Sequence, residues 1–230
     1  MMKVVVRAAL PPWTSRGIVA RRLLGIPVLA DPITVWPHYA SRHPDVMFVQ
    51  IGSHNGLDGD PLARWIDQNP RWQGIMVEPV PAQFEALSKL RGRDPRFRLV
   101  RAAITDHDGT VDMTVVDGSA RAGMLSSIDA EIVRKNGVSA SQTRQVAVPA
   151  MTFASLIEGV PPIDVLHIDT EGHDAVILDQ VDLVRVRPSV LMYESVHLSA
   201  ADRERCETRL IEAGYRVVSN PFDTVGILDG

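Results

Sequence analysis

The sequence predicts an α/β domain in which a mainly parallel sheet carries helices on both faces. From residue 45 onward, short apolar segments typical of buried strands alternate with amphipathic segments typical of helices. A glycine-bearing turn follows the first of these strands, as in sheets that bind a ligand at their carboxyl edge. With 230 residues, 45% of them apolar, the chain is long enough to bury one substantial core.

The first half of the regular pattern opens with VMFVQI (46–51), a run rich in β-branched and aromatic residues that favours a buried strand. The second helix places Phe84, Leu87 and Leu90 on one stripe. Turn residues at 106–109 separate the third strand from an extra one. The elements predicted here are strands at residues 46–51, 75–78, 97–104 and 111–116, and helices at residues 62–68 and 82–90.

The second half begins with the least periodic stretch, residues 117–144, rich in Ser, Ala and Gly, with one short helix expected at 128–135. A loop of this length in a compact domain is more often a functional lid than padding. Further on, Ser199 and Asp202 form a capping-box pattern that opens a helix ending near Gly214. The remaining predicted elements are helices at residues 153–157 and 175–183, and strands at residues 163–168, 190–193, 215–218 and 225–228.

The charge balance and the cysteine count exclude several classes of protein. The net charge, 24 − 28 = −4, argues against a general nucleic-acid binder, which needs a basic face to neutralise phosphates. The single cysteine, Cys206, excludes a disulfide framework and a multi-cysteine zinc site. No apolar run approaches the roughly 18 residues that span a bilayer, so we expect a cytoplasmic protein without a transmembrane segment.

Residues 1–44 precede the regular pattern, and we expect them to form an arm added to a domain at residues 45–230. The arm carries Lys and Arg but no acid before Asp31, and prolines interrupt its apolar stretches. The continuous apolar block of a signal peptide is not present. An irregular segment packed on the core, a substrate lid, a homodimer contact and a contact with an anionic surface are all compatible with this composition.

Features after the first three strands point to a ligand that contains adenosine. Gly52 and Gly56 make a G-x-x-x-G turn, which permits close backbone approach but lacks the middle glycine of the dinucleotide fingerprint. A nicotinamide cofactor is therefore disfavoured. Glu78 ends the second strand, where an acid accepts hydrogen bonds from ribose hydroxyls. Ala103 and Ile104 end the third strand and are placed either to flank an adenine ring or to pack in the core.

The richest cluster of titratable groups, HIDTEGHD, lies at the end of the fourth predicted strand and in the turn that follows it. Asp169, Glu171 and His173 lie at or beyond the strand end, where parallel sheets bind their ligands. Glu194 ends the fifth strand, so adjacent parallel strands would bring it close to Asp169. These two carboxylates are candidates to bind Mg²⁺ as a metal pair, or to bind a polyhydroxylated substrate directly.

Six segments share their order with a known family of proteins. They are VQIGSHNG (49–56), MVEPVPAQFEAL (76–87), RAAITDHDGT (101–110), MLSS (124–127), IDVLHIDTEGHDAVIL (163–178) and PSVLMYES (188–195). In this order they resemble the FkbM-type S-adenosylmethionine-dependent methyltransferases over about residues 45–200. Many members have Asp where this chain has Gln50, and the family pattern gives His173 the least support.

The resemblance implies the class I methyltransferase fold, a Rossmann-like three-layer sandwich around a seven-stranded, mostly parallel sheet whose last strand is antiparallel. It also implies S-adenosyl-L-methionine as the cofactor. Within that site Glu78 would hold the ribose and Ser126 would flank the adenine, while Asp169 and Glu171 would lie near the transferred methyl group. The residues implied in cofactor binding are Gln50, Gly52, Ser53, Asn55, Gly56, Glu78, Pro79, Ala103, Ile104 and Ser126.

Together the residues and the resemblance predict an O-methyltransferase acting on a hydroxyl of a sugar, a glycoside or a glycosylated natural product. Asp169, Glu171 or His173 would accept the hydroxyl proton, and Glu194 would orient the acceptor or share a metal ion. The partner would be a small molecule or an oligosaccharide rather than nucleic acid. Two alternatives stay open: an NAD-dependent oxidoreductase on a Rossmann-like sheet, and a non-catalytic nucleotide-binding scaffold.

Overall fold

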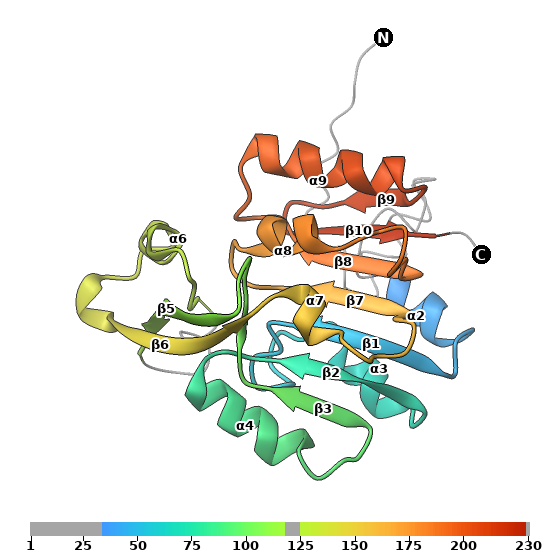
Figure 1. The fold of residues 1–230 in the computed structure, drawn as a ribbon, viewed down its shortest axis with the longest axis horizontal. Helices are drawn as coiled ribbons and strands as arrows, with labels where there is room; N and C mark the ends of the chain where they lie inside the picture. Colours follow the sequence, from blue (N-terminus) through green and yellow to red (C-terminus); the bar gives the residue numbers. More distant parts are fainter. Residues whose placement is uncertain (1–33, 118–124, 229–230) are drawn as a thin grey trace, which may run out of the picture.

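The main sheet is the centre of the structure, a computed structural model that describes residues 34–117 and 125–228. Its strands are β1 (Val46–Ile51), β2 (Trp72–Val77), β3 (Phe97–Val100), β7 (Val165–Ile168), β8 (Val190–Glu194), β9 (Arg216–Ser219) and β10 (Asp223–Ile227). They lie in the order β3-β2-β1-β7-β8-β10-β9 (Figure 1). All neighbours are parallel except β10, which runs antiparallel to β8 and β9. The seven-stranded, mostly parallel sheet expected from the sequence is confirmed.

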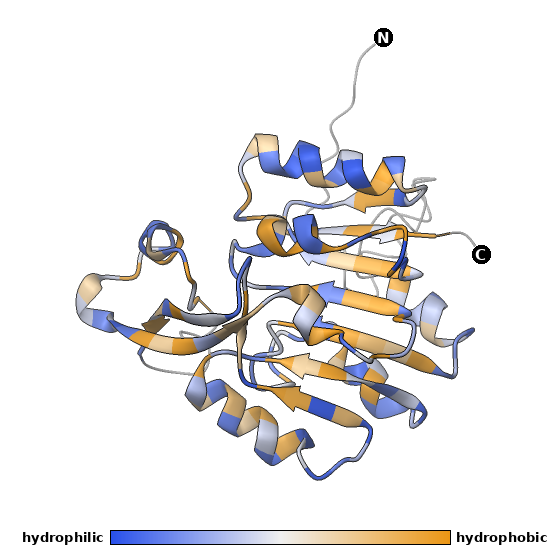
Figure 2. Cartoon of the chain, in the orientation of Figure 1, coloured by the Kyte–Doolittle hydropathy of each residue, from blue (hydrophilic) through white to orange (hydrophobic). Residues whose placement is uncertain are grey.

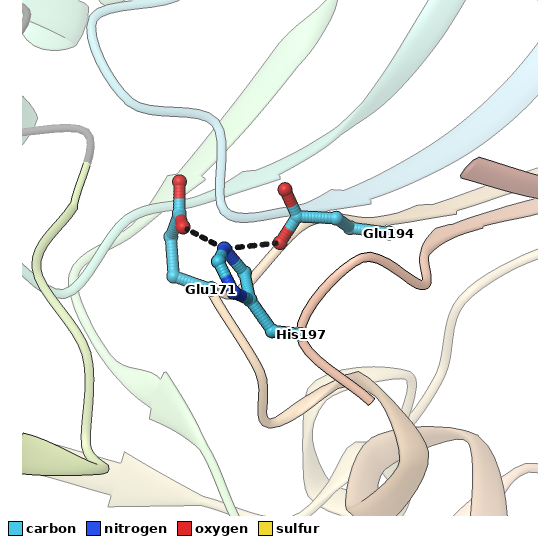
Figure 3. Close-up of side chains that lie close together, drawn as sticks. All are labelled: Glu171, Glu194 and His197. Carbon is cyan, nitrogen blue, oxygen red and sulfur yellow. Dashed lines mark ion pairs between the residues drawn. The ribbon is translucent and has the colours of Figure 1, made fainter. Parts of the chain in front are cut away.

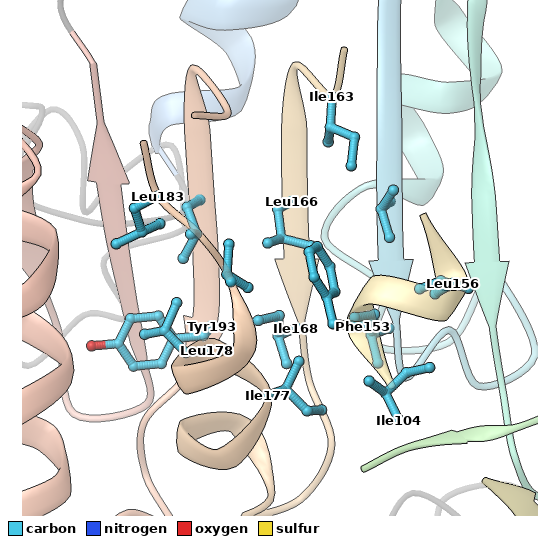
Figure 4. Packing of buried hydrophobic residues seen from close by; sticks show 14 of the residues in the cluster. Ile104, Phe153, Leu156, Ile163, Leu166, Ile168, Ile177, Leu178, Leu183 and Tyr193 are labelled. Carbon is cyan, nitrogen blue, oxygen red and sulfur yellow. The ribbon is translucent and has the colours of Figure 1, made fainter. Parts of the chain in front are cut away.

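Helices cover both faces of this sheet, because the central strands carry apolar side chains on both faces. They are α2 (Val35–Ala40), α3 (Ala63–Gln68), α4 (Pro81–Arg91), α7 (Phe153–Leu156), α8 (Asp174–Gln180) and α9 (Ala200–Glu212). The first three pack on the face that carries Phe48 and Met76. The other three pack on the face that carries Leu166 and Ile168 (Figure 4). Figure 2 shows the resulting hydrophobic strands with hydrophilic residues on the outside of α9.

A second sheet lies beside the carboxyl ends of the main strands and corrects the sequence prediction (Figure 1). It has the order β4-β6-β5, with β4 (Ala103–Ile104), β5 (Gly109–Val116) and β6 (Thr143–Met151). Residues 97–104 are therefore not one strand, because β3 ends at Val100 and the next two strand residues pair with β6. The sequence prediction has no strand at β6, whose Pro149 lacks the N–H that a ladder uses.

The stretch predicted as a long loop also contains regular structure. Helix α6 (Ala130–Lys135) matches the expected short helix, and a 3₁₀ turn at Ala140–Gln142 leads into β6. Residues 118–124 lie outside the described residues. No helix within the described ranges is long and apolar enough to cross a membrane.

Helix α2 joins part of the predicted N-terminal arm to the core. Trp36 is 1% exposed and belongs to the same buried cluster as Phe48 and Trp72. The Trp72 indole Nε1 donates a hydrogen bond to the carbonyl of His43 at 2.9 Å. The α2 segment of the arm is therefore packed on the core. The lid and dimer predictions apply to residues 1–44, of which residues 1–33 lie outside the described residues, and the domain boundary at residue 45 stays a prediction.

Candidate active site

A cavity opens at the carboxyl ends of β1, β2 and β7, between the main sheet and the second sheet. The space between its lining residues is about 800 Å³, with the open solvent at its mouth included. Met113 of β5 and Ile128 also line it, so both sheets form its walls. The predicted site residues that line it are Gln50, Gly52, Ser53, Glu78, Pro79, Ala103, Ile104, Ser126, Asp169, Glu171 and His173. Asn55, Gly56 and Glu194 are not among its lining residues.

The turn after β1 brings three strand ends together. The backbone N–H groups of Gly52 and Ser53 both donate to the Val77 carbonyl at 2.9 Å, and the Asp169 N–H donates to the Ile51 carbonyl at 2.8 Å. Gly52 has a φ of +84°, and a Cβ there would lie 1.6 Å from the Asp169 carbonyl oxygen. Only glycine fits this turn.

Glu78 follows β2 directly and faces the cavity with 5% of its surface exposed. One carboxylate oxygen accepts the His54 backbone N–H at 2.9 Å, and the other accepts the Val80 N–H at 2.8 Å. Burial raises the pKa of Glu78 to about 7, although both hydrogen bonds act in the opposite direction. The carboxyl therefore changes charge near neutral pH.

Asn55 and Gly56 shape the loop rather than line the cavity. The Asn55 side-chain oxygen accepts the backbone N–H groups of Leu57 at 3.0 Å and Asp58 at 2.9 Å. A Cβ on Gly56 would lie 2.6 Å from a methyl carbon of Leu87 on α4. Their predicted contacts with the cofactor stay predictions, and their visible role is to hold the turn against α4.

Polar side chains of β1 and β7 form the floor of the cavity. Gln50 and His167 are paired in the register of the two strands, and both line the cavity. Gln50 donates its Nε2 to Asp60 Oδ1 at 2.8 Å, and Asp60 also accepts the Leu62 N–H at 2.7 Å. Gln50 Oε1 and Asp60 Oδ2 are buried and have no hydrogen-bond partner among the described residues. Burial lowers the pKa of His167 to about 4, so its imidazole is neutral at physiological pH.

The turn after β7 carries Asp169, Glu171 and His173 into the cavity. Glu171 has a φ of +54°, and its carbonyl accepts the Ser127 hydroxyl at 2.8 Å. Burial raises the pKa of Asp169 well above its ordinary value, and nearby carboxylates, Asp174 first, add to this effect. Burial lowers the pKa of His173, against the opposing effect of two nearby acids. This turn concentrates ionisable groups in a place shielded from water.

Glu171 also lies close to Glu194, the last residue of β8, and to His197, which follows that strand. His197 Nε2 lies 2.9 Å from Glu171 Oε2 and 3.9 Å from Glu194 Oε2 (Figure 3). Burial, then the charges of Asp169 and Glu171, raise the pKa of Glu194 far above its ordinary value. Among the described residues, Glu171, Glu194 and His197 form the group whose donor atoms are spaced to hold a metal ion. The predicted metal pair shares Glu194 with this group but not Asp169.

A model of the methyltransferase FkbM domain matches residues 50–217 of the chain. The chain belongs to this family. The matched segment runs from β1 to β9 and contains every cavity-lining residue named above. The family predicted from the sequence is thus confirmed.

Several solved methyltransferases are similar to this FkbM-domain protein in structure. A precorrin-6y C5,15-methyltransferase from Geobacter metallireducens is 12% identical, over 85% of this chain and 86% of that chain, with a TM-score of 0.48. A ribosomal protein L11 methylase from Lactobacillus delbrueckii subsp. bulgaricus is 8% identical, over 86% and 78%, with a TM-score of 0.41. CalO1, a methyltransferase in calicheamicin biosynthesis with SAH bound, is 15% identical, over 94% and 59%, with a TM-score of 0.36. No curated protein matches the chain by sequence.

Asp60 and His197 are among the side chains of this FkbM-domain protein that the sequence analysis does not predict as site residues. Asp60 lines the cavity, and the one available signal is its position just before a predicted helix, where Asp commonly accepts backbone N–H groups. His197 follows Glu194 by three residues, but no spacing rule connects it with Glu171. Its position depends on the adjacency of β7 and β8.

We expect Gly52→Ala to destabilise the protein much more than Gly137→Ala. The two glycines have similar φ angles of +84° and +80°, so each substitution carries about 1–2 kcal/mol of left-handed strain. A Cβ at Gly137 meets nothing within 4 Å, whereas at Gly52 it meets the Asp169 carbonyl. In urea unfolding we expect Gly52→Ala to lose at least about 2 kcal/mol more than its control. Equal losses would contradict the tight turn.

Proposed function

We propose that the chain transfers the methyl group of S-adenosylmethionine to a hydroxyl of a sugar, a glycoside or a glycosylated natural product. The observation that carries this proposal is that one cavity contains both Glu78 after β2 and the ionisable groups after β7. Because β1 lies between these strands, the two strand ends are about 10 Å apart. This separation leaves room for a nucleoside at one side and an acceptor at the other.

The cavity residues suit S-adenosylmethionine chemically. Each Glu78 carboxylate oxygen accepts one backbone N–H and keeps a lone pair for a ribose hydroxyl. Gln50 Oε1 and Asp60 Oδ2 are buried acceptors without a partner among the described residues, and an ammonium group such as that of methionine needs acceptors. Ala103 and Ile104 are buried apolar residues at the cavity wall, which suits the adenine ring.

When bound, S-adenosylmethionine supplies an electrophilic methyl group on a sulfonium. An acceptor hydroxyl is a poor nucleophile while it keeps its proton, so a side chain of the cavity must accept that proton. The proposed bases are Asp169, Glu171 and His173, which all line the cavity. Of these, His173 presents a buried Nε2 without a partner among the described residues. Glu194 lies close to Glu171 and to His197, and it is proposed to position the acceptor through Glu171.

The acidity of the cavity supports a neutral acceptor. Asp60, Glu78, Asp169 and Glu171 line it and no Lys or Arg is among its described lining residues, so nothing there would neutralise the phosphates of a polyanionic substrate such as RNA. A sugar or glycoside instead offers hydroxyl donors, which carboxylates accept. The proposed partner is therefore a small hydroxylated molecule or an oligosaccharide.

Parallel calorimetric titrations with S-adenosylhomocysteine and NAD test the cofactor. We expect S-adenosylhomocysteine to bind at one site per chain and NAD to show no heat of binding, because the turn lacks the middle glycine that gives a pyrophosphate room. Binding of NAD alone would mean an oxidoreductase. Binding of S-adenosylhomocysteine with no turnover of S-adenosylmethionine on a panel of sugars and glycosides would instead mean a non-catalytic scaffold.

The affinity for S-adenosylhomocysteine should weaken as the pH falls through 7. Ribose hydroxyls donate to the ionised Glu78 carboxylate, and protonation below its pKa of about 7 removes that acceptor. From pH 8 to pH 6 we therefore expect the dissociation constant to rise about tenfold. Glu78→Gln should bind weakly at both pH values with little difference between them, while Glu85→Gln, an exposed change on α4, should follow the wild type. A wild-type affinity independent of pH would contradict the role of Glu78.

A further inference from the structure

Glu171, Glu194 and His197 converge from three positions along the chain. Glu171 lies in the turn after β7, Glu194 ends β8, and His197 lies between β8 and α9. The three side chains point at one another in Figure 3, and each of the three is only 16–17% exposed. One donor atom from each lies within 4.8 Å of the other two.

The contacts in this group are not ordinary hydrogen bonds. Glu171 Oε2 and Glu194 Oε2 are both buried from solvent and have no hydrogen-bond donor among the described residues. The imidazole nitrogen is 2.9 Å from Glu171 Oε2 but is not aligned to donate to it. Buried carboxylate oxygens without donors are costly, so a partner of another kind would stabilise this arrangement.

Two of the separations are close to those between ligands of one octahedral cation. Bonds of about 2.1 Å at right angles place neighbouring donor atoms about 3 Å apart and opposite ones about 4.2 Å apart. The nitrogen of His197 lies 2.9 Å from one carboxylate oxygen and 3.9 Å from the other. Small shifts of these side chains would centre all three donors on one ion.

We propose that Glu171, Glu194 and His197 bind one divalent cation through two carboxylates and one imidazole. Carboxylates suit Mg²⁺ and Mn²⁺, and an imidazole moves the preference toward the transition metals, so Mn²⁺ is the expected best fit. Glu171 also lines the cavity, which places the cation beside the acceptor. Its catalytic use, to make an acceptor hydroxyl more acidic, rests on the proposed function; the binding of the cation does not.

Electron paramagnetic resonance of the full chain titrated with MnCl₂ tests the site. We expect one Mn²⁺ per chain, displaced by excess MgCl₂, with a binding constant at least tenfold weaker in Glu194→Gln and in His197→Gln. Matched controls are Glu85→Gln and His107→Gln, which change an exposed carboxylate and an exposed imidazole elsewhere and should bind like the wild type. No uptake by the wild type, or equal affinity in all variants, would overturn the proposal.

Pulsed electron paramagnetic resonance of the wild type tests the ligand set directly. The outcome then does not depend on whether each variant folds. Bound Mn²⁺ should show hyperfine coupling to one imidazole nitrogen, and a spectrum without nitrogen coupling would overturn the proposed ligand set. The same preparations are titrated with S-adenosylhomocysteine. Binding of S-adenosylhomocysteine without Mn²⁺ would reject the metal site alone, and binding of Mn²⁺ without S-adenosylhomocysteine would reject the proposed function alone.

Discussion

The close approach of the Gly52 backbone to the Asp169 carbonyl determines where the other site residues lie. Because a Cβ at Gly52 would lie 1.6 Å from that oxygen, the ends of β1 and β7 can meet only through glycine. The same turn donates two N–H groups to the end of β2, and its next residue, His54, donates to Glu78. The backbone of one turn thus fixes both the proposed nucleoside side and the proposed acceptor side of the cavity.

The acids around this turn give the cavity its electrostatic character. Burial raises the pKa values of Asp60, Asp169 and Glu194, and repulsion from neighbouring carboxylates adds to this effect at Asp169 and Glu194. Burying these carboxyl groups together therefore makes folding less favourable. A positively charged ligand would recover part of that cost. Both proposed ligands, a sulfonium cofactor and a divalent cation, carry positive charge, so the acidity that opposes folding would favour their binding.

The sequence predicts the elements that are determined by residues near one another in the chain. It does not predict strands and side-chain contacts whose partners are distant in sequence. Gly52 and Glu78 follow apolar strands, so the strand-end rule finds them. The break between β3 and β4 has no turn signal, because no Gly or Pro interrupts residues 97–104, while the partner of β4 is β6, more than forty residues away in sequence. His197 is found only in the structure, because its approach to Glu171 depends on the turn that the left-handed Glu171 makes after β7.

A crystal structure of the full chain with S-adenosylhomocysteine would test the central claim most directly, that the cavity at the ends of β1, β2 and β7 is the cofactor site. The account predicts the ribose hydroxyls on the Glu78 carboxylate, the homocysteine part beside the Gly52 turn, and the sulfur facing the Asp169–Glu171 segment. A ligand bound elsewhere, or a ribose that does not contact Glu78, would contradict it.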